Sequence, residues 1–324
     1  MRTKLSSHHI LSNELIYKHC INDNGRITSC EGTIMPQGHK IPSQSSTFIY
    51  CEFNSLSYTD SGGAVSFSSS SSTLTISDSI FTFCTSSVFG GPIYATNCGL
   101  VTLHRISYIS CSCSANKWGG GAVLIYDVPI MPEITDNCFI SCASRVDGGG
   151  LDLRSVTASN LENIPVKGCK FISCVANGDI GESRIDADGG GLIFWTNHNT
   201  LGFSDSLFAK CESKTRAGGS FVTINADYFD YIIRFCFYCE NIAQIGTNSL
   251  IHFNSTDGEP WNSVFFRSFT SDADITKSLV KSYYEQTLVS DNWLPLPSIY
   301  AALRPVPNNN PDDTLFSVDN NLKA

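Results

Sequence analysis

The chain has 324 residues, of which 42% are hydrophobic and 16% charged, and its formal net charge is -9. This hydrophobic content excludes a largely disordered chain, and the acidic balance argues against a nucleic-acid ligand, because no excess of basic residues is present to neutralise phosphates. The 25 Gly residues, with many Ser and Asn, favour a strand-rich protein with tight turns.

The N-terminal segment lacks the apolar run of about 7 to 15 residues that a signal peptide needs. No segment reaches the roughly 20 consecutive apolar residues of a membrane helix. We expect residues 1–14 to cap the fold that follows. Localisation stays open at this point.

A repeat runs from about residue 15 to residue 275, and its first element is an aromatic residue followed three places later by Cys. Successive copies are 27 to 37 residues apart, with a mean of 31. The last two copies are degenerate. The copies are Tyr17/Cys20, Phe48/Cys51, Phe81/Cys84, Tyr108/Cys111, Phe139/Cys142, Phe171/Cys174, Phe208/Cys211, Cys236/Cys239 and Phe265/Ser268.

A second element, a run of glycines leading into a short apolar segment, lies between copies of the first. The distance from the last Gly to the next aromatic position is nearly constant, whereas the distance from Cys to the next Gly run varies. We therefore expect insertions to leave from one turn and to stack along one edge of the fold. The runs are at Gly62, Gly90, Gly119, Gly148, Gly189 and Gly218.

These two elements predict an all-β fold, a single-stranded right-handed parallel β-helix of about nine coils of about 31 residues, because short strands separated by Gly, Ser and Asn show no helical period. Each coil should hold two or three strands. Glycine would supply a coil corner with positive φ, and the aromatic and Cys side chains would fill the interior. We expect residues 276–324, which follow the repeat, to form a capping segment and a disordered tail rich in Pro and Asn.

The 14 cysteines recur at the interval of the repeat and are not clustered, so we interpret most of them as reduced core residues. Cys111-x-Cys113 and Cys236-x-x-Cys239 are four coils apart and cannot share one tetrahedral zinc ion. The seven His residues show no common repeat position. We predict no metal and no cofactor.

The motifs Gly62-Gly63-Ala64-Val65 and Gly120-Gly121-Ala122-Val123, together with the aromatic-x-x-Cys motif, resemble the Gly-Gly-Ala-Ile and Phe-x-x-Asn repeats of the chlamydial polymorphic outer-membrane proteins. Similar β-helix repeats occur in surface proteins of parabasalid protists. Cys stands here where the chlamydial motif has Asn. The resemblance implies a pectin-lyase-like fold, a cell-surface or extracellular location and a role in adhesion, and it carries no catalytic residues.

Polysaccharide lyases and hydrolases share this fold, so an enzyme is the first alternative. Its best candidate is the long insertion after Val175, which would lie near Asp147, Asp152 and Arg154 of the preceding coil; a solvated loop, or a loop that holds Ca²⁺, is also compatible. Because the Gly-His-Gly and paired-Asp signatures of pectinases are missing, we assign no catalytic residue. The residues that we assign to a binding site are Asp179, Glu182, Arg184, Asp186, Asp188 and Trp195.

The segment Leu151-Asp-Leu-Arg154 must direct its leucines inward, since Asp152 and Arg154 would otherwise be buried. Carried across the coils, this register predicts a contiguous apolar outer face that the tail or a partner covers. The residues predicted on that face are Val65, Phe67, Ile93, Val123, Ile125, Ile193, Trp195 and Phe221.

The leading hypothesis from the sequence is a non-enzymatic, monomeric interaction module of adhesin type that binds a host or cell-surface protein or a glycan. A degenerate family copy without activity is the second alternative. An acidic cluster at a groove would favour the enzyme, and a smooth outer face would favour binding.

Overall fold

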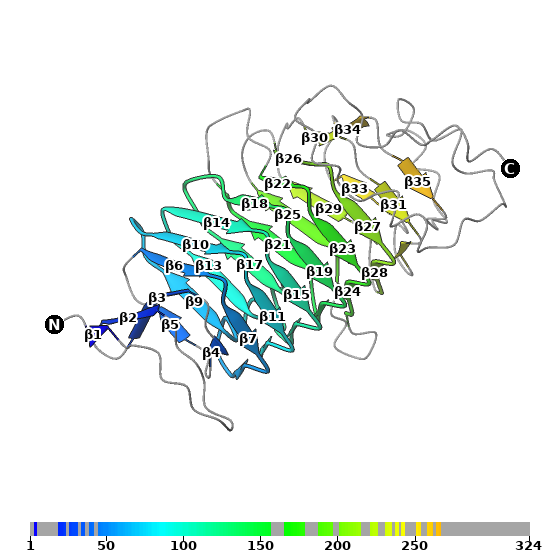
Figure 1. The fold of residues 1–324 in the computed structure, drawn as a ribbon. Coiled ribbons are helices and arrows are strands. Elements are labelled where there is room, and N and C mark those ends of the chain that lie inside the picture. The colour runs from blue at the N-terminus through cyan, green and yellow to red at the C-terminus, as the bar shows by residue number, and fades with distance from the viewer. Residues whose placement is uncertain are drawn as a thin grey trace, which may run out of the picture.

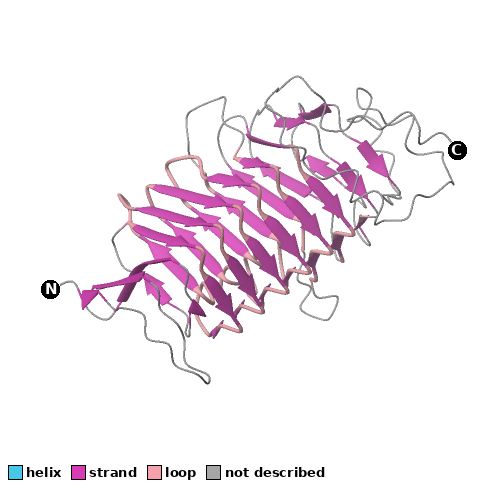
Figure 2. Ribbon diagram, viewed as in Figure 1, coloured by secondary structure: helices cyan, strands magenta, loops and turns pink. Residues whose placement is uncertain are grey.

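The computed structural model (Figure 1) describes residues 45–156, 165–178, 187–196 and 201–214. Outside these ranges it describes the backbone of short strands and, in addition, Asn241. The described chain consists of strands and turns with no helix, as Figure 2 shows. The fold is all-β, a right-handed parallel β-helix, which confirms the prediction from the repeat.

Four sheets, here called A, B, C and D, run along the β-helix, and each coil contributes a strand to each sheet in the order A, B, D, C. Four strands per coil is more than the two or three that the sequence predicts. Pairing between coils is parallel, and only the first strands of sheet A, β1 to β3, pair antiparallel.

Sheets A and B contain more strands than sheets C and D. Sheet A contains β1 (Thr3–Lys4), β2 (His19–Asp23), β3 (Arg26–Glu31), β6 (Ser46–Ile49), β10 (Thr73–Ser77), β14 (Leu100–His104), β18 (Glu133–Thr135), β22 (Val166–Lys167), β26 (Leu201–Ser204), β30 (Tyr231–Arg234) and β34 (Gly258–Trp261). Sheet B contains β4 (Ile34–Met35), β7 (Glu52–Asn54), β11 (Ile80–Thr82), β15 (Ser107–Ile109), β19 (Cys138–Ile140), β23 (Lys170–Ile172), β27 (Leu207–Ala209), β31 (Phe237–Cys239) and β35 (Val264–Phe266).

Sheets D and C complete each coil. Sheet D contains β8 (Ser57–Tyr58), β12 (Thr85–Ser86), β16 (Ser112–Cys113), β20 (Ala143–Ser144), β24 (Val175–Ala176), β28 (Glu212–Ser213) and β32 (Ile242–Ala243). Sheet C contains β5 (His39–Ile41), β9 (Val65–Ser68), β13 (Ile93–Thr96), β17 (Val123–Tyr126), β21 (Leu151–Arg154), β25 (Leu192–Thr196), β29 (Phe221–Asn225) and β33 (Ile251–Phe253).

Four coils lie within the range described without interruption, residues 45–156, which is fewer than the nine coils that the motif count predicts. The strands of the shorter described segments on either side pair into the same sheets. Residues 5–14 and 276–324, which contain most of the predicted N-terminal cap and all of the predicted tail, lie outside the described residues.

The turns of a coil differ in how much their length varies from one coil to the next. Between sheets A and B, and between B and D, each turn in the described coils has two residues. The connection from D to C is longer and variable, reaching from Asn177 to Gly191 before β25. The predicted single site of insertion is therefore the D–C connection, although the turn from C to A also lengthens after β21.

Positive φ occurs at every kind of corner. Glycine supplies it before sheet C, for example at Gly120, where φ is 76° and an added Cβ would lie 2.2 Å from the Val123 carbonyl oxygen. The other corners mostly use non-glycine residues, among them Asp78, Arg105 and Asp136 between sheets A and B, where Gly168 is an exception. Such residues adopt this conformation at a cost that the stacked neighbours must offset.

A stack of aromatic rings fills the interior beneath sheet B, as predicted. The ring centroids of Phe53, Phe81, Tyr108, Phe139, Phe171 and Phe208 follow one another at 4.3 to 5.3 Å, all with a stacked geometry. The second copy of the motif is therefore Phe53/Leu56, not Phe48/Cys51, because Phe53 pairs in register with Phe81.

A column of thiols lies beside the rings. Each thiol contacts the carbonyl oxygen of the ring residue one coil earlier, for example Cys142 Sγ with the Tyr108 oxygen at 3.5 Å and Cys174 Sγ with the Phe139 oxygen at 3.4 Å. The ten cysteines in the described ranges are free thiols, and nine of them are buried. Burial raises the pKa of the Cys142 and Cys174 thiols, so these groups stay protonated.

Asn241 takes the place of Cys at the end of this column. Its Nδ2 donates to the Phe208 carbonyl at 2.9 Å, and its Oδ1 accepts from the Cys211 amide. Tyr238 pairs in register with Phe208, so this copy of the motif is Tyr238/Asn241 and not Cys236/Cys239. Here Asn therefore makes the same contact that the thiols make elsewhere.

The prediction of an apolar outer face on sheet C is wrong for most of the residues that were assigned to it. Val65, Ile93 and Val123 pair in register with Leu151, and Phe67 and Ile125 lie in the column of Leu153, so all of them face the core. Phe221 pairs with Leu192 of the same inward column. The predicted register of sheet C is shifted by one residue. In the run Gly148 to Gly150, the third glycine, Gly150, occupies the position that Ala64 and Ala122 occupy in other coils.

Candidate functional site

Two of the six residues assigned to binding are described, and they lie near the outer face of sheet C. Asp188 is buried at the end of the D–C connection, whereas Trp195 on β25 is 40% exposed. Asp179, Glu182, Arg184 and Asp186 lie outside the described residues. The predicted proximity of the insertion to the preceding coil holds at Asp188, whose amide donates to Asp147 Oδ1 at 2.9 Å.

Asp147, Asp152 and Arg154, here called the Arg154 triad, form the centre of this region. Arg154 Nε lies 2.8 Å from both carboxylate oxygens of Asp152, and Nη2 donates to Asp147 Oδ2. Asp152 Oδ2 also accepts from the Gly119 amide at 3.2 Å. The leucines of this strand face inward as predicted, but Asp152 and Arg154 are 0% and 3% exposed, so they are not solvated.

Burial dominates the electrostatics of the triad. It raises the pKa of Asp152 to about 6, against the lowering effect of the Arg154 guanidinium, and the nearby charge of Asp147 raises that pKa further. Desolvation lowers the pKa of Arg154, but the carboxylates of Asp152 and Asp147 outweigh it and the net direction is upward. The three charges depend on one another, because a buried charge without a partner is strongly destabilising.

The D–C connections cover the triad because they pack on the outer face of sheet C. Leu124 and Ile193 are in the outward register with Asp152 and are nevertheless fully buried. Trp118, from the connection before β17, lies over Tyr126 with a centroid distance of 4.7 Å. Ile193 therefore lies on the outer side as predicted, under its own chain.

Aromatic side chains line this surface from coil to coil, and we call Phe89, Tyr94, Trp118, Tyr126 and Trp195 the aromatic strip. Phe89 lies 5.7 Å from Tyr94 and 5.4 Å from Trp118 between ring centroids. The Arg154 guanidinium carbon lies 5.8 Å from the Trp118 centroid and 4.9 Å from the Trp195 centroid. Arg154 thus joins Trp195 to the other four rings by cation–π contacts.

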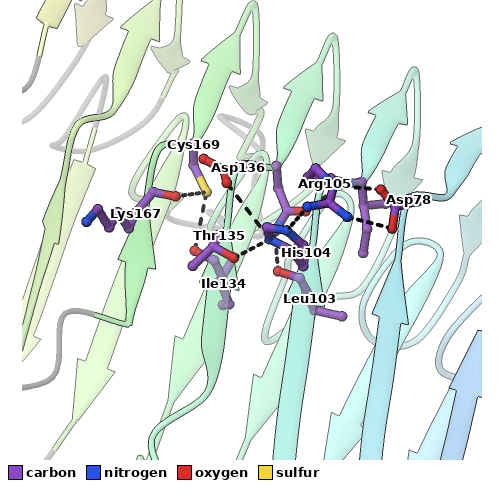
Figure 3. Close-up of polar contacts among 11 residues, drawn as sticks. Asp78, Leu103, His104, Arg105, Ile134, Thr135, Asp136, Lys167 and Cys169 are labelled. Carbon is purple, nitrogen blue, oxygen red and sulfur yellow. Dashed lines mark hydrogen bonds and ion pairs between the residues drawn. The ribbon is translucent and has the colours of Figure 1, made fainter. Parts of the chain in front are cut away.

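A second polar cluster lies at the corner between sheets A and B (Figure 3). Arg105 binds the Asp78 carboxylate with two nitrogens, at 2.6 and 2.9 Å, and donates through Nη1 to His104 Nε2. His104 Nδ1 lies 2.6 Å from Thr135 Oγ1 and 3.9 Å from Asp136 Oδ2. These contacts join three successive coils.

The corner cluster is not arranged as a hydroxyl nucleophile with a histidine base. Because Arg105 donates to Nε2, the proton of the neutral His104 ring is on Nδ1, which then donates to Thr135. A general base would need a free acceptor nitrogen toward that hydroxyl. Since Arg105 is 55% exposed, its ion pair contributes little to stability.

The carboxylates of Asp147 and Asp152 are paired with Arg154, and both residues are buried, as is Asp188. An enzyme in this region would therefore depend on Asp179, Glu182, Arg184 and Asp186. Among the described residues, no group of three or more His, Cys, Asp or Glu side chains is arranged to hold a metal ion. The described side chains of this region are the aromatic rings of the strip and the buried, paired charges of the Arg154 triad.

Sequence reasoning missed Phe89, Tyr94, Trp118 and Tyr126. Tyr94 and Tyr126 alternate with inward residues on their strands, so a correct register would have placed them outward. Phe89 and Trp118 belong to irregular connections, for which the sequence shows no period.

No family profile matches this chain, and our comparisons with curated proteins and with solved structures also gave no match. In the part of the chain that the structure describes, no helix has the length and apolar character needed to span a membrane.

Proposed function

We propose that this chain is a non-enzymatic interaction module of adhesin type, which binds a host or cell-surface protein or a glycan through the outer face of sheet C. The aromatic strip is the observation that supports the proposal. Its rings are half-buried or exposed and extend over successive coils along one surface.

The composition of the strip is that of a binding surface. Tyr and Trp bury a large area at a low cost in conformational entropy, and they dominate the energetics of many interfaces. The Arg154 triad holds the strip rigid from beneath, since it links the D–C connection to strand β21 and supports both indole rings. A surface fixed in this way loses little freedom when a ligand binds.

The motif resemblance supports the same proposal at the level of family. A pectin-lyase-like β-helix with Gly-Gly-Ala-Val and aromatic-x-x-Cys repeats resembles proteins exposed on cell surfaces. The Tyr238/Asn241 copy brings the repeat closer to the chlamydial Phe-x-x-Asn motif. We infer a cell-surface location from this resemblance, and we further propose that the chain is monomeric.

The binding surface is tested with Trp195→Ala, compared with Tyr50→Ala as a matched control, because Tyr50 is 60% exposed at a corner between sheets A and B. Binding to a glycan array and to intact cells should fall about tenfold in Trp195→Ala and persist in Tyr50→Ala. Equal binding by both variants would contradict the proposed surface. Surface labelling of cells with and without permeabilisation tests the location, and a signal only after permeabilisation would contradict it.

A further inference from the structure

The outer face of sheet B carries an apolar column, whereas the sequence predicts one on sheet C. Ile109, Ile140 and Ile172 pair in register on the neighbouring strands β15, β19 and β23 (Figure 1). Each follows an inward ring of the aromatic stack on its strand and therefore points away from the core. All three are half-buried, and we call them the isoleucine column.

The apolar surface continues across the turn from sheet B to sheet D. Ala143 and Val175 pair in register on β20 and β24, where they are the outward, half-buried residues. Phe83 lies at the same turn after β11 and is 56% exposed. These residues therefore form a patch over neighbouring coils and two sheets, and they are not scattered single side chains.

The outer face of sheet A shows that strand formation does not require isoleucine at such positions. Thr75 and Thr102 pair in register there, point outward and are half-buried, and Glu133 follows them on the next strand. Thr and Ile are both β-branched, so both suit a strand. An outward column of Ile therefore indicates a face that is covered, and an outward column of Thr indicates one in contact with water.

The end of the outer face of sheet B that is nearer to the C-terminus is buried. Leu207 and Ala209 on β27 pair in register with Lys170 and Ile172 and are therefore outward, yet they are 6% and 0% exposed. Strand β35, the last one that the structure describes, ends sheet B on this side. The chain thus continues toward its C-terminus from the sheet that carries the isoleucine column.

Residues 292–303 of the continuing chain have the composition of a cover for this face. They include no charged residue, and half of them are large and apolar. These are Trp293, Leu294, Leu296, Ile299, Tyr300 and Leu303. Such side chains are stabilised by removal from water. Pro295 and Pro297 favour an extended backbone without ladder hydrogen bonds, which suits a segment that lies on the face of a sheet and is not a strand of it.

The chain is long enough to reach the isoleucine column. β35 and β19 are four strands apart in sheet B, which is about 19 Å at about 4.8 Å per strand. The chain between Phe266, at the end of β35, and Trp293 spans up to about 85 Å when extended. Residues 292–303 themselves extend over about 37 Å in a polyproline conformation, which is enough to cross every coil of the column.

We propose that residues 292–303 dock on the isoleucine column of sheet B as an intramolecular cover. The apolar side chains of the segment would pack on Ile109, Ile140 and Ile172 across successive coils. This face is separate from the aromatic strip of sheet C, so the inference does not rest on the proposed function. A face covered by its own chain is not free to join a second copy, which agrees with the proposed monomer.

The first test maps the contact in the full chain. Benzoylphenylalanine, a photo-crosslinker, replaces Tyr300, and tandem mass spectrometry of the irradiated protein identifies the residues that it has joined. The crosslinks should form within one chain, on the outward residues of β15, β19 and β23 or on the turns beside them. Crosslinks to another face, crosslinks between two chains, or no crosslinks would overturn the inference.

A triple variant tests the apolar contact itself. Ile109→Thr, Ile140→Thr and Ile172→Thr keep a β-branched residue at each position and give sheet B an outer column like that of sheet A. Chymotrypsin cleavage after Tyr300 should then be at least about tenfold faster, because the cleavage rate follows the population of the undocked segment.

The matched control is a double variant of sheet A, Thr75→Ala and Thr102→Ala, which should be cleaved within about twofold of the wild-type rate. Circular dichroism verifies that both variants keep their β structure. If the triple variant does not fold, Leu296→Asp changes only the segment and should lower the crosslink yield about tenfold. An unchanged cleavage rate in the folded triple variant, or an unchanged crosslink yield in Leu296→Asp, would overturn the inference.

Discussion

The inner column beneath sheet B and the outer column of sheet C follow opposite rules. The inner column repeats one kind of residue, an aromatic ring, from Phe53 to Phe208. The outer column changes at each coil, reading Ser66, Tyr94, Leu124, Asp152 and Ile193. A residue that recurs in every coil packs against its own copies and determines the fold of the coil. A residue that occurs in one coil only determines the surface at that place. Under the proposed function, the departures from the repeat are the residues that we expect to contact a ligand.

The largest expected effect comes from breaking the outer arrangement at Arg154. Arg154→Met leaves Asp147 and Asp152 buried without their cation and should lower the free energy of unfolding by about 3–5 kcal/mol. Urea unfolding at neutral pH measures this loss. A triple variant that also carries Asp147→Asn and Asp152→Leu removes all three charges and should recover most of the stability; no recovery would mean that the loss comes from packing and not from unpaired charge.

The inner arrangement should be similarly sensitive at Phe139, whose ring is stacked between Tyr108 and Phe171 at 4.8 and 4.7 Å. Phe139→Ala opens a cavity in the core and should cost about 3–5 kcal/mol in the same measurement. Unlike Arg154→Met, it should not be rescued by any change on the outer face. A loss below about 1 kcal/mol would show that neighbouring coils collapse into the space.

A change of pH should affect the stability of the outer region and not that of the inner column, because the Arg154 triad titrates and the rings do not. The folded pKa of Asp152, about 6, lies above its unfolded value near 3.9, so the folded protein binds more protons between these pH values. This contribution to stability is complete below about pH 4 and is lost as the pH rises through about 6.

Asp152→Asn removes this titration but keeps an acceptor for Arg154. The stability of the wild type relative to Asp152→Asn should therefore fall, by on the order of 2 kcal/mol, as the pH rises from about 4 to about 7. Unfolding curves recorded across this range provide the measurement. A relative stability that rises with pH would contradict the raised pKa.

The smallest effect is expected at Tyr108, the one tyrosine in the described ring stack. Its hydroxyl is buried and has no hydrogen-bond partner, while its neighbours in the stack are Phe81 and Phe139. Tyr108→Phe should leave stability unchanged or raise it by about 1 kcal/mol, because an unsatisfied polar group is removed. Thermal unfolding distinguishes this from a loss of similar size, which would indicate a buried water on the hydroxyl.

The sequence predicted the β-helix because its core motif is periodic, and the i to i+3 spacing placed rings and thiols inside correctly. The register of sheet C was predicted wrongly, since a run of three glycines after Asp147 and a run of two after Ser61 look alike when aligned on their last glycine. That error of one residue moved Val65 and Phe67 to the wrong side. The cover over Asp152 was not predictable either, because irregular connections such as the one with Trp118 carry no period.

The D–C connections also bear on how such a gene can change. Each coil contacts its immediate neighbours, so duplication or deletion of one whole repeat by unequal recombination would preserve the remaining inner contacts. The surroundings of Arg154 have no such freedom, because Trp118, Asp147 and Trp195 come from three consecutive coils. A recombination event between these coils would divide the cluster, so we expect variants of this protein to differ in length outside residues 118–195 while inheriting that segment as one block.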